Sequence, residues 1–239
     1  MPRYHIIACH VLWREFCYYA ALSRNTFTFC FLPQGLHNTP DVLRAEAQKA
    51  VDAAPADSEA ILLGYGLCSR GIEGVAARKT RLVVARAHDC ITYLLGTKER
   101  YRQYFDSHPG TYWYSPGWID TQSQPGKARY EETRRKYVEQ YGEDNAQYLM
   151  EMEQGWFKEY SNAAYIDLGF GDNAEYREFT RECAEWLGWK YDELPGDPSL
   201  VRDLLDGTWD AARFVVVEPG QTLCASHDDT VIKAGATKT

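Results

Sequence analysis

Residues 60–71, Ala60-Ile61-Leu62-Leu63-Gly64-Tyr65-Gly66-Leu67-Cys68-Ser69-Arg70-Gly71, join a short apolar run to a glycine-rich segment. The run at 60–64 predicts a strand that is buried on both faces, because it lacks the alternation of a half-exposed strand. Similar strand-forming runs occur at 4–9, 26–32 and 82–85, and helical patterns separate them. Strands that alternate with helices in this way predict a mainly parallel sheet.

The expected fold class is α/β, with a mainly parallel sheet covered by helices on both faces in a Rossmann-like, three-layer arrangement. A polar helical pattern at about residues 127–160 is typical of a helical insertion in the second half of the chain. A single domain over residues 1–239 with one continuous sheet is the simpler interpretation, and a boundary near residue 120 is the alternative. Further strands are expected at 111–114, 164–168 and 214–217, and an irregular tail over the last dozen residues.

The composition excludes several classes of protein. Of the 239 residues, 45% are hydrophobic and 25% are charged, a balance that excludes wholesale disorder. The net charge of −8 is opposite in sign to the positive charge typical of nucleic-acid-binding proteins, and anionic membranes would repel such a chain. No apolar run approaches the ~20 residues that span a bilayer, and no charged leader precedes the first strand. We therefore expect a cytoplasmic protein with neither a nucleic-acid nor a membrane partner.

Three of the seven cysteines lie at or just beyond the ends of predicted strands. The odd number of cysteines and the lack of a secretory signal argue against a disulfide framework. In a parallel sheet, ligands bind beyond the carboxyl ends of the strands, which is where Cys9, Cys68 and Cys90 are expected. Thiolates and imidazoles are preferred zinc ligands. These three cysteines are therefore the candidate zinc ligands, with His37 as the fourth ligand or as a partner of a ligand.

Other residues near the same strand ends are further candidates. His88 follows the fourth strand and Glu15 lies one turn into the first helix, so both are candidates for catalysis. Glu15 would act as a ligand, a proton acceptor or an anchor for Arg14. Glycines beside Cys68 allow the backbone to approach a bound ion closely. The candidates for holding a cofactor or substrate are Gly66, Gly71, Tyr65 and Trp113.

Several kinds of chemistry remain open at this predicted site. A metal-free cysteine nucleophile would pair Cys90 with His88, or Cys68 with His37. Three cysteines also suit an iron–sulfur cluster. A free cysteine often packs as a small hydrophobic residue, which is the interpretation that we prefer for Cys17, Cys30 and Cys183.

These segments resemble a bacterial and archaeal protein family that is catalogued as domain of unknown function 1638. The first half contributes Ala8-Cys9-x-x-Leu12-x-Arg14-Glu15, Leu36-His37-Asn38-x-Pro40, Tyr65-x-x-Cys68-x-x-Gly71, His88-x-Cys90 and Gly110-Thr111-Tyr112. The second half adds the weaker matches Tyr165-Ile166 and Ala184-x-x-Leu187-Gly188. The sequence departs from the family pattern at Leu67-Cys68-Ser69, where many members have Asp-Cys-Gly, and at His88-Asp89-Cys90, where they have His-Cys.

The resemblance implies a link to one-carbon metabolism, because similar proteins are often encoded beside genes for corrinoid-dependent methyl transfer. It implies a small-molecule substrate such as a methylated amine, and a metal–thiolate transferase as the class of enzyme. It also leaves open a non-catalytic accessory protein that binds a corrinoid, a corrinoid protein or a metal.

Overall fold

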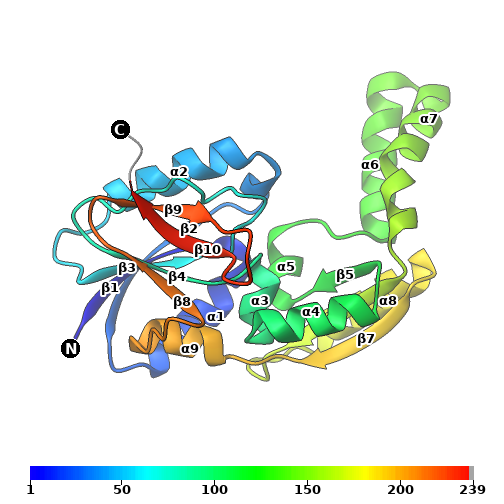
Figure 1. Ribbon diagram of the computed structural model, residues 1–239. Helices are drawn as coiled ribbons and strands as arrows, with labels where there is room; N and C mark the ends of the chain where they lie inside the picture. The colour runs from blue at the N-terminus through cyan, green and yellow to red at the C-terminus, as the bar shows by residue number, and fades with distance from the viewer. Residues whose placement is uncertain (237–239) are drawn as a thin grey trace. The chain divides into compact units, whose positions relative to one another are not determined.

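The computed structural model describes residues 1–236, and the chain forms two compact units (Figure 1). Unit 1 comprises Met1–Tyr101 together with the residues from Gly196 on, and unit 2 comprises Arg102–Pro195. Within residues 1–236, no helix combines the length and the apolar character needed to cross a membrane. Two compact units can still fold together as one domain, so the single domain predicted over residues 1–239 remains a prediction.

Unit 1 is built on a five-stranded sheet with the strand order β2-β1-β3-β4-β8. The strands are β1 (Arg3–Cys9), β2 (Thr26–Leu32), β3 (Ala60–Gly64), β4 (Leu82–Ala85) and β8 (Phe214–Val217). The first four are parallel, and β8 pairs with β4 in the antiparallel direction. Every residue of β3 and β4 is buried, as their unbroken apolar runs predicted. A mixed α/β fold with a mainly parallel central sheet is therefore confirmed.

The strand order reverses between β1 and β3. From β1 the chain passes through α1 (Trp13–Leu22) to β2 at the sheet edge, and then returns through α2 (Pro40–Asp52) to β3 on the other side of β1. In Figure 1, α1 lies with α9 (Ser199–Asp206) on one side of this sheet, and α2 lies on the other. In open α/β sheets, ligands typically bind beyond the carboxyl ends of the strands at such a reversal.

The helical pattern that follows β4 is divided in two. It forms two helices, α3 (Cys90–Leu95) and α4 (Lys98–Ser107). Gly96 ends α3 with a φ of 81°, in the left-handed region that favours glycine. A Cβ at this position would also lie 2.6 Å from the Asp197 carboxyl carbon, so the close packing requires glycine as well.

Unit 2 has its own parallel sheet of β5 (Thr111–Tyr114), β6 (Asn162–Asp167) and β7 (Lys190–Pro195). One continuous sheet is therefore wrong, because β5 and β6 pair in the second sheet. The sequence missed β7, whose mostly charged and polar residues do not resemble a buried strand. The remaining elements of unit 2 are α5 (Pro116–Thr121), α6 (Lys127–Tyr141), α7 (Glu143–Glu153), a 3₁₀ helix (Gln154–Glu159) and α8 (Ala174–Leu187).

The end of the described chain is a hairpin of β9 (Gln221–Ala225) and β10 (Ile232–Ala236). The irregular tail predicted for the last dozen residues is therefore wrong for 232–236, and residues 237–239 lie outside the described part. Ile232 in β10 is fully buried, and its burial helps to hold this segment against the rest of unit 1. Gly74 N and Ala77 N donate to carbonyl groups of β9, so the hairpin is joined to the loop after β3.

Candidate functional site

Two loops at the carboxyl ends of β3 and β4 are hydrogen-bonded to each other. Leu67 N donates to Ala87 O at 2.8 Å, and Cys68 N donates to His88 O at 2.9 Å. Gly66 permits this approach, since a Cβ there would lie 2.4 Å from the Asp89 backbone nitrogen. These backbone contacts hold the segment that carries Cys68 beside the segment that carries Cys90.

The loop after β3 makes a left-handed turn at Cys68, Ser69 and Arg70, whose φ values are 47°, 56° and 66°. Gly71 N closes the turn by donating to Cys68 O at 2.9 Å. A residue other than glycine in this region costs about 1–3 kcal/mol, and such strain is concentrated at functional sites. Gly71 packs tightly as well, because a Cβ there would lie 2.5 Å from Leu43 Cδ2.

Cys9, Cys68 and Cys90 form a cluster of mutually interacting thiols, which we call the thiol cluster. Cys9 ends β1, Cys68 follows β3, and Cys90 begins α3 after β4. Burial is the largest cause that raises the pKa of each thiol. Cys9 raises the pKa of both other thiols, and Cys68 also raises that of Cys90. The structure thus brings together the three cysteines that the strand ends predicted, and holds them as neutral thiols.

Tyr65 is a buried tyrosine whose hydroxyl interacts with this cluster. Only 3% of the residue is exposed. Its hydroxyl lowers the pKa of Cys9. Within residues 1–236, however, no donor or acceptor meets the distance and angle limits of a hydrogen bond with this hydroxyl. Burial raises the pKa of Tyr65, and Cys9, Cys68 and Cys90 raise it further. A buried hydroxyl without a hydrogen bond lowers the stability of the fold by about 1–3 kcal/mol, so the presence of tyrosine at this position requires an explanation.

Replacing Tyr65 by phenylalanine is expected to increase the free energy of unfolding by about 1 kcal/mol, because the costly hydroxyl is removed. The matched control is Tyr93→Phe. Tyr93 is fully buried, and its hydroxyl donates to Leu63 O at 2.9 Å, so this variant is expected to lose about 1–3 kcal/mol. Urea denaturation of both variants measures the difference. A destabilised Tyr65→Phe protein would show that the Tyr65 hydroxyl has a structural role.

Asp89, which the sequence marked only as a departure from the family pattern, lies beside the thiol cluster. Its carboxylate caps α3 by accepting a hydrogen bond from Ile91 N at 3.0 Å. Burial raises the pKa of Asp89, which opposes the effect of its hydrogen bonds. The Asp89 charge raises the pKa values of Cys68 and Cys90. An aspartate directly before an apolar helical run is a recognised N-cap signal that could have identified this role.

His37 also approaches this region. It lies in a short 3₁₀ helix, Leu36–Asn38, that follows β2. Burial lowers the pKa of its imidazole, and the charge of Asp89 partly opposes that shift. A half-buried imidazole that is neutral at physiological pH has the protonation state that a metal ligand needs. His37 therefore remains the candidate for a fourth ligand or for a partner of a ligand.

The other predicted site residues lie in different environments. The His88 side chain is exposed. Its backbone carbonyl accepts a hydrogen bond from Cys68 N, and this bond helps to hold the two loops together. Glu15 is 2% exposed in the first turn of α1 and interacts electrostatically with Cys17 and Tyr19. Trp113 lies in β5 of unit 2, where its ring centroid is 5.1 Å from that of Tyr104. Trp113 therefore belongs to the three-stranded sheet of unit 2 and not to the sheet that carries Cys9.

The thiol cluster is not arranged around a common point. Within the described part of the chain, no group of three or more His, Cys, Asp and Glu side chains is positioned to hold a metal ion. All seven cysteines are free. The site therefore supplies three protonated thiols, a buried hydroxyl and a neighbouring imidazole.

A family model described as "Protein of unknown function (DUF1638)" matches residues 31–205. The match covers about three quarters of the chain and includes His37, Cys68 and Cys90, whereas Cys9 precedes it. No curated protein and no solved structure matches the chain. The family match therefore supports the resemblance and supplies no activity.

Proposed function

Since the chain belongs to the DUF1638 family, whose description assigns no activity, we propose a function from the site itself. The protein binds a thiophilic metal ion, zinc in the first instance, through Cys9, Cys68 and Cys90. It uses that site in a group-transfer reaction on a small molecule. The observation that carries this proposal is the thiol cluster, which three parallel strands supply from their carboxyl ends.

The position of the thiol cluster supports a ligand site. Cys9 and Cys68 follow β1 and β3, the two strands between which the strand order reverses. Ligands of open α/β sheets bind at such a reversal. The proposal includes a Rossmann-like, three-layer class for unit 1. The chain moves outward from β1 through α1 to β2 and then back through α2 to β3, and α1 and α2 lie on opposite faces of the sheet (Figure 1). It also includes a cytoplasmic location, where thiols stay reduced.

Metal binding requires a change in the cysteine side chains. Neutral thiols are not stabilised electrostatically when they lie close together, whereas three thiolates are stabilised when they coordinate one cation. Rotation about the Cα–Cβ bonds is the movement that the proposal requires of Cys9, Cys68 and Cys90. The hydrogen bonds between the two loops then keep the backbone of the site in place during this rotation.

The chemistry of the thiols favours a metal over a free nucleophile. Cysteine nucleophiles have a lowered pKa, usually because a cation or an imidazolium lies beside them. Here burial raises the pKa of Cys68 and Cys90, and the negative charge of Asp89 raises both further. A cation reverses this balance by stabilising the thiolates.

The reaction that we propose is transfer of a one-carbon group such as methyl to a thiol, with a methylated amine as the first donor to test. The new S–C bond would replace the N–C bond, and the amine would leave with the proton that the thiol gives up. Three protein ligands leave a position open for a substrate or water, as in catalytic zinc sites. When bound, zinc would supply a cation that keeps a thiol deprotonated for alkylation. The chain itself orients the cysteines, and burial limits their contact with water.

Zinc binding is expected to release protons and to strengthen as the pH rises. Cys9, Cys68 and Cys90 are protonated at neutral pH because their pKa values are raised, so binding at pH 7 should release about three protons per zinc ion. The affinity should therefore rise steeply between about pH 6 and pH 8. Calorimetry in buffers of different ionisation enthalpy measures the proton release. Zinc binding without proton release would exclude these thiols as ligands, and no binding would refute the proposed function.

A further inference from the structure

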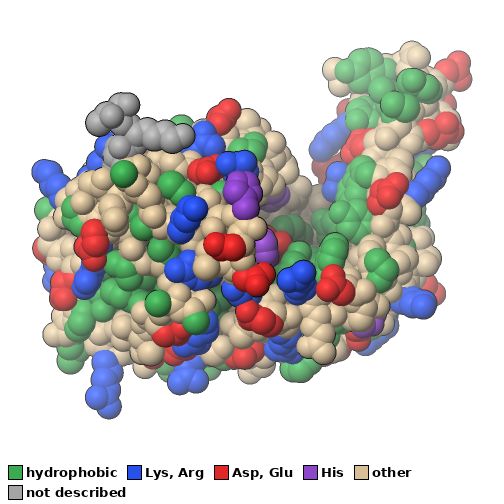
Figure 2. Space-filling view, in the orientation of Figure 1, with side chains coloured by type: hydrophobic (Ala, Val, Ile, Leu, Met, Phe, Trp, Pro, Cys, Tyr) green, Lys and Arg blue, Asp and Glu red, His purple; other side chains and the backbone are tan. Residues whose placement is uncertain are grey.

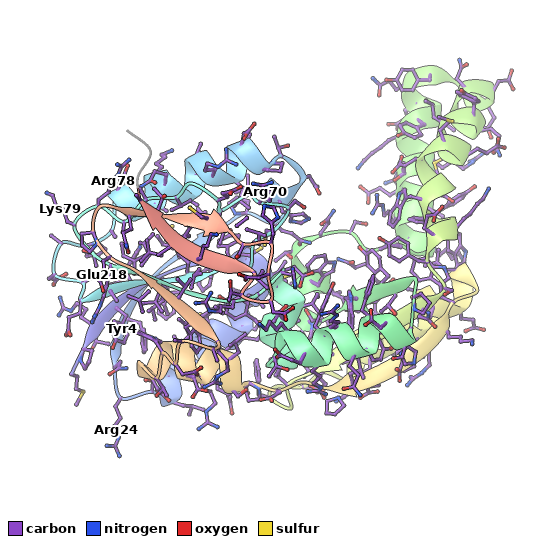
Figure 3. All side chains as sticks on the ribbon, in the orientation of Figure 1. Tyr4, Arg24, Arg70, Arg78, Lys79 and Glu218 are labelled. Carbon is purple, nitrogen blue, oxygen red and sulfur yellow. The ribbon has the colours of Figure 1, made fainter. Side chains whose placement is uncertain are left out.

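A cavity of 580 Å³ lies in unit 1 between α2, the loop after β3 and the hairpin strands β9 and β10. Its volume is in the range of small-molecule sites, which is about 300–1,000 Å³. The charged side chains that line it are Arg44, Arg70, Arg78 and Glu73. Figure 3 shows Arg70 and Arg78 on the side of unit 1 that carries α2 and β9.

The walls of this cavity are held by hydrogen bonds. Gln48 on α2 accepts from Ala76 N at 2.7 Å. On the opposite wall, Gly74 N donates to Leu223 O at 2.7 Å, and Leu223 N donates to Val75 O at 2.9 Å. A cavity whose walls are fixed in this way binds a ligand without a large ordering cost.

The positive charges in the cavity exceed the negative charge. Glu73 is its only acidic lining residue in the described part of the chain, and it accepts from Arg70 Nε at 2.7 Å and from Ala225 N at 3.2 Å. Arg44 donates through Nε to the carbonyl oxygen of Glu73, a neutral partner that leaves its charge in place. The charged partner of Arg44 is Asp41, whose side chain is 90% exposed and is therefore strongly screened by water.

Arg78 adds to this local excess of positive charge. Its Nε lies 3.2 Å from Asp52 Oδ1, and both side chains are about half exposed, so the pair leaves much of the charge available. The surface of unit 1 in Figure 2 carries acidic and basic side chains interspersed, and the whole chain has a net charge of −8. The positive cavity is thus a local feature that opposes the overall charge.

We propose that this cavity binds a small molecule carrying several oxyanion groups, either phosphates or carboxylates. Arginine guanidinium groups bind both kinds of group through paired hydrogen bonds. A single phosphate fills only a small part of the cavity, so the ligand carries at least two such groups. Arg70 directly follows Cys68 and Ser69, so a bound anion would also contact the strained turn that carries Cys68.

The test is calorimetric titration of the full-length protein with pyrophosphate and, separately, with citrate. We expect one binding event per chain, weakened about tenfold or more in Arg70→Gln and in Arg78→Gln, since each removes a charge-assisted hydrogen bond. The matched control is Arg24→Gln, because Arg24 is exposed and Figure 3 shows it on the opposite side of unit 1. Tighter binding of pyrophosphate assigns a phosphorylated ligand, and tighter binding of citrate assigns a carboxylated one.

Two results would overturn this inference. The first is the absence of binding of either anion at millimolar concentration. The second is equal weakening in Arg24→Gln, which would indicate a non-specific effect of net charge. Both are independent of zinc, so the anion cavity and the thiol cluster can fail separately.

Discussion

Replacement of Cys68 by serine is expected to lower the affinity for zinc by about two to three orders of magnitude. The binding of zinc to structural sites with four protein ligands is worth roughly 10–16 kcal/mol at pH 7, so one such ligand accounts for about 2.5–4 kcal/mol. Serine preserves the size of the side chain and replaces a thiolate by a hydroxyl that stays protonated. Competition titration against a chromophoric chelator measures the change.

Cys17→Ser is the control for this prediction. Cys17 is a partly exposed thiol on α1, outside the thiol cluster, so its loss should leave zinc affinity unchanged. Urea denaturation without metal should show Cys68→Ser to be folded, because Cys68 lies in a loop beyond the buried strand β3. Equal zinc affinities for Cys68→Ser and the wild type would remove Cys68 from the site.

Replacement of Gly66 by alanine is expected to abolish zinc binding and to destabilise the protein by about 3 kcal/mol. The added Cβ would lie 2.4 Å from Asp89 N and 2.6 Å from Asp89 Cα, both backbone atoms that a rotamer change cannot move. The two loops must therefore separate, which breaks the hydrogen bond from Cys68 N to His88 O. Overpacking of this kind typically costs 1–3 kcal/mol, and the lost hydrogen bond adds about 1 kcal/mol.

The control for Gly66→Ala is Gly155→Ala. Gly155 has no other atoms within 4 Å of an added Cβ, so the stability and the zinc affinity of this variant should match those of the wild type. Urea denaturation and zinc titration of the two alanine variants test the prediction together. If Gly66→Ala binds zinc as tightly as the wild type, the contact between the loops is not needed to assemble the thiol cluster.

The strands of unit 1 could be predicted because their apolar runs reflect burial on both faces. The predicted ranges 26–32, 60–64, 82–85 and 214–217 coincide with β2, β3, β4 and β8. Parallel strands direct their carboxyl ends to one edge, so this pattern was also enough to place Cys9, Cys68 and Cys90 in one cluster. The positions of these three cysteines at the strand ends therefore followed from hydrophobic patterning without any local motif.

The features that could not be predicted depend on tertiary contacts. β7, Lys190–Pro195, is largely polar and is specified by pairing with β6, which no local pattern reveals. The hairpin of β9 and β10 likewise depends on its contact with the loop after β3. The role of Gly66 follows from its distance to Asp89, and the sequence does not encode that distance in any spacing rule.

The most direct test of the central claim is the zinc content of the protein after anaerobic purification. Elemental analysis of the wild type should find about one zinc ion per chain, and a Cys9/Cys68/Cys90 triple serine variant should contain none. A chelated wild-type sample should recover the same content when zinc is added back. A wild-type protein that contains no metal and takes up no added zinc would contradict the account.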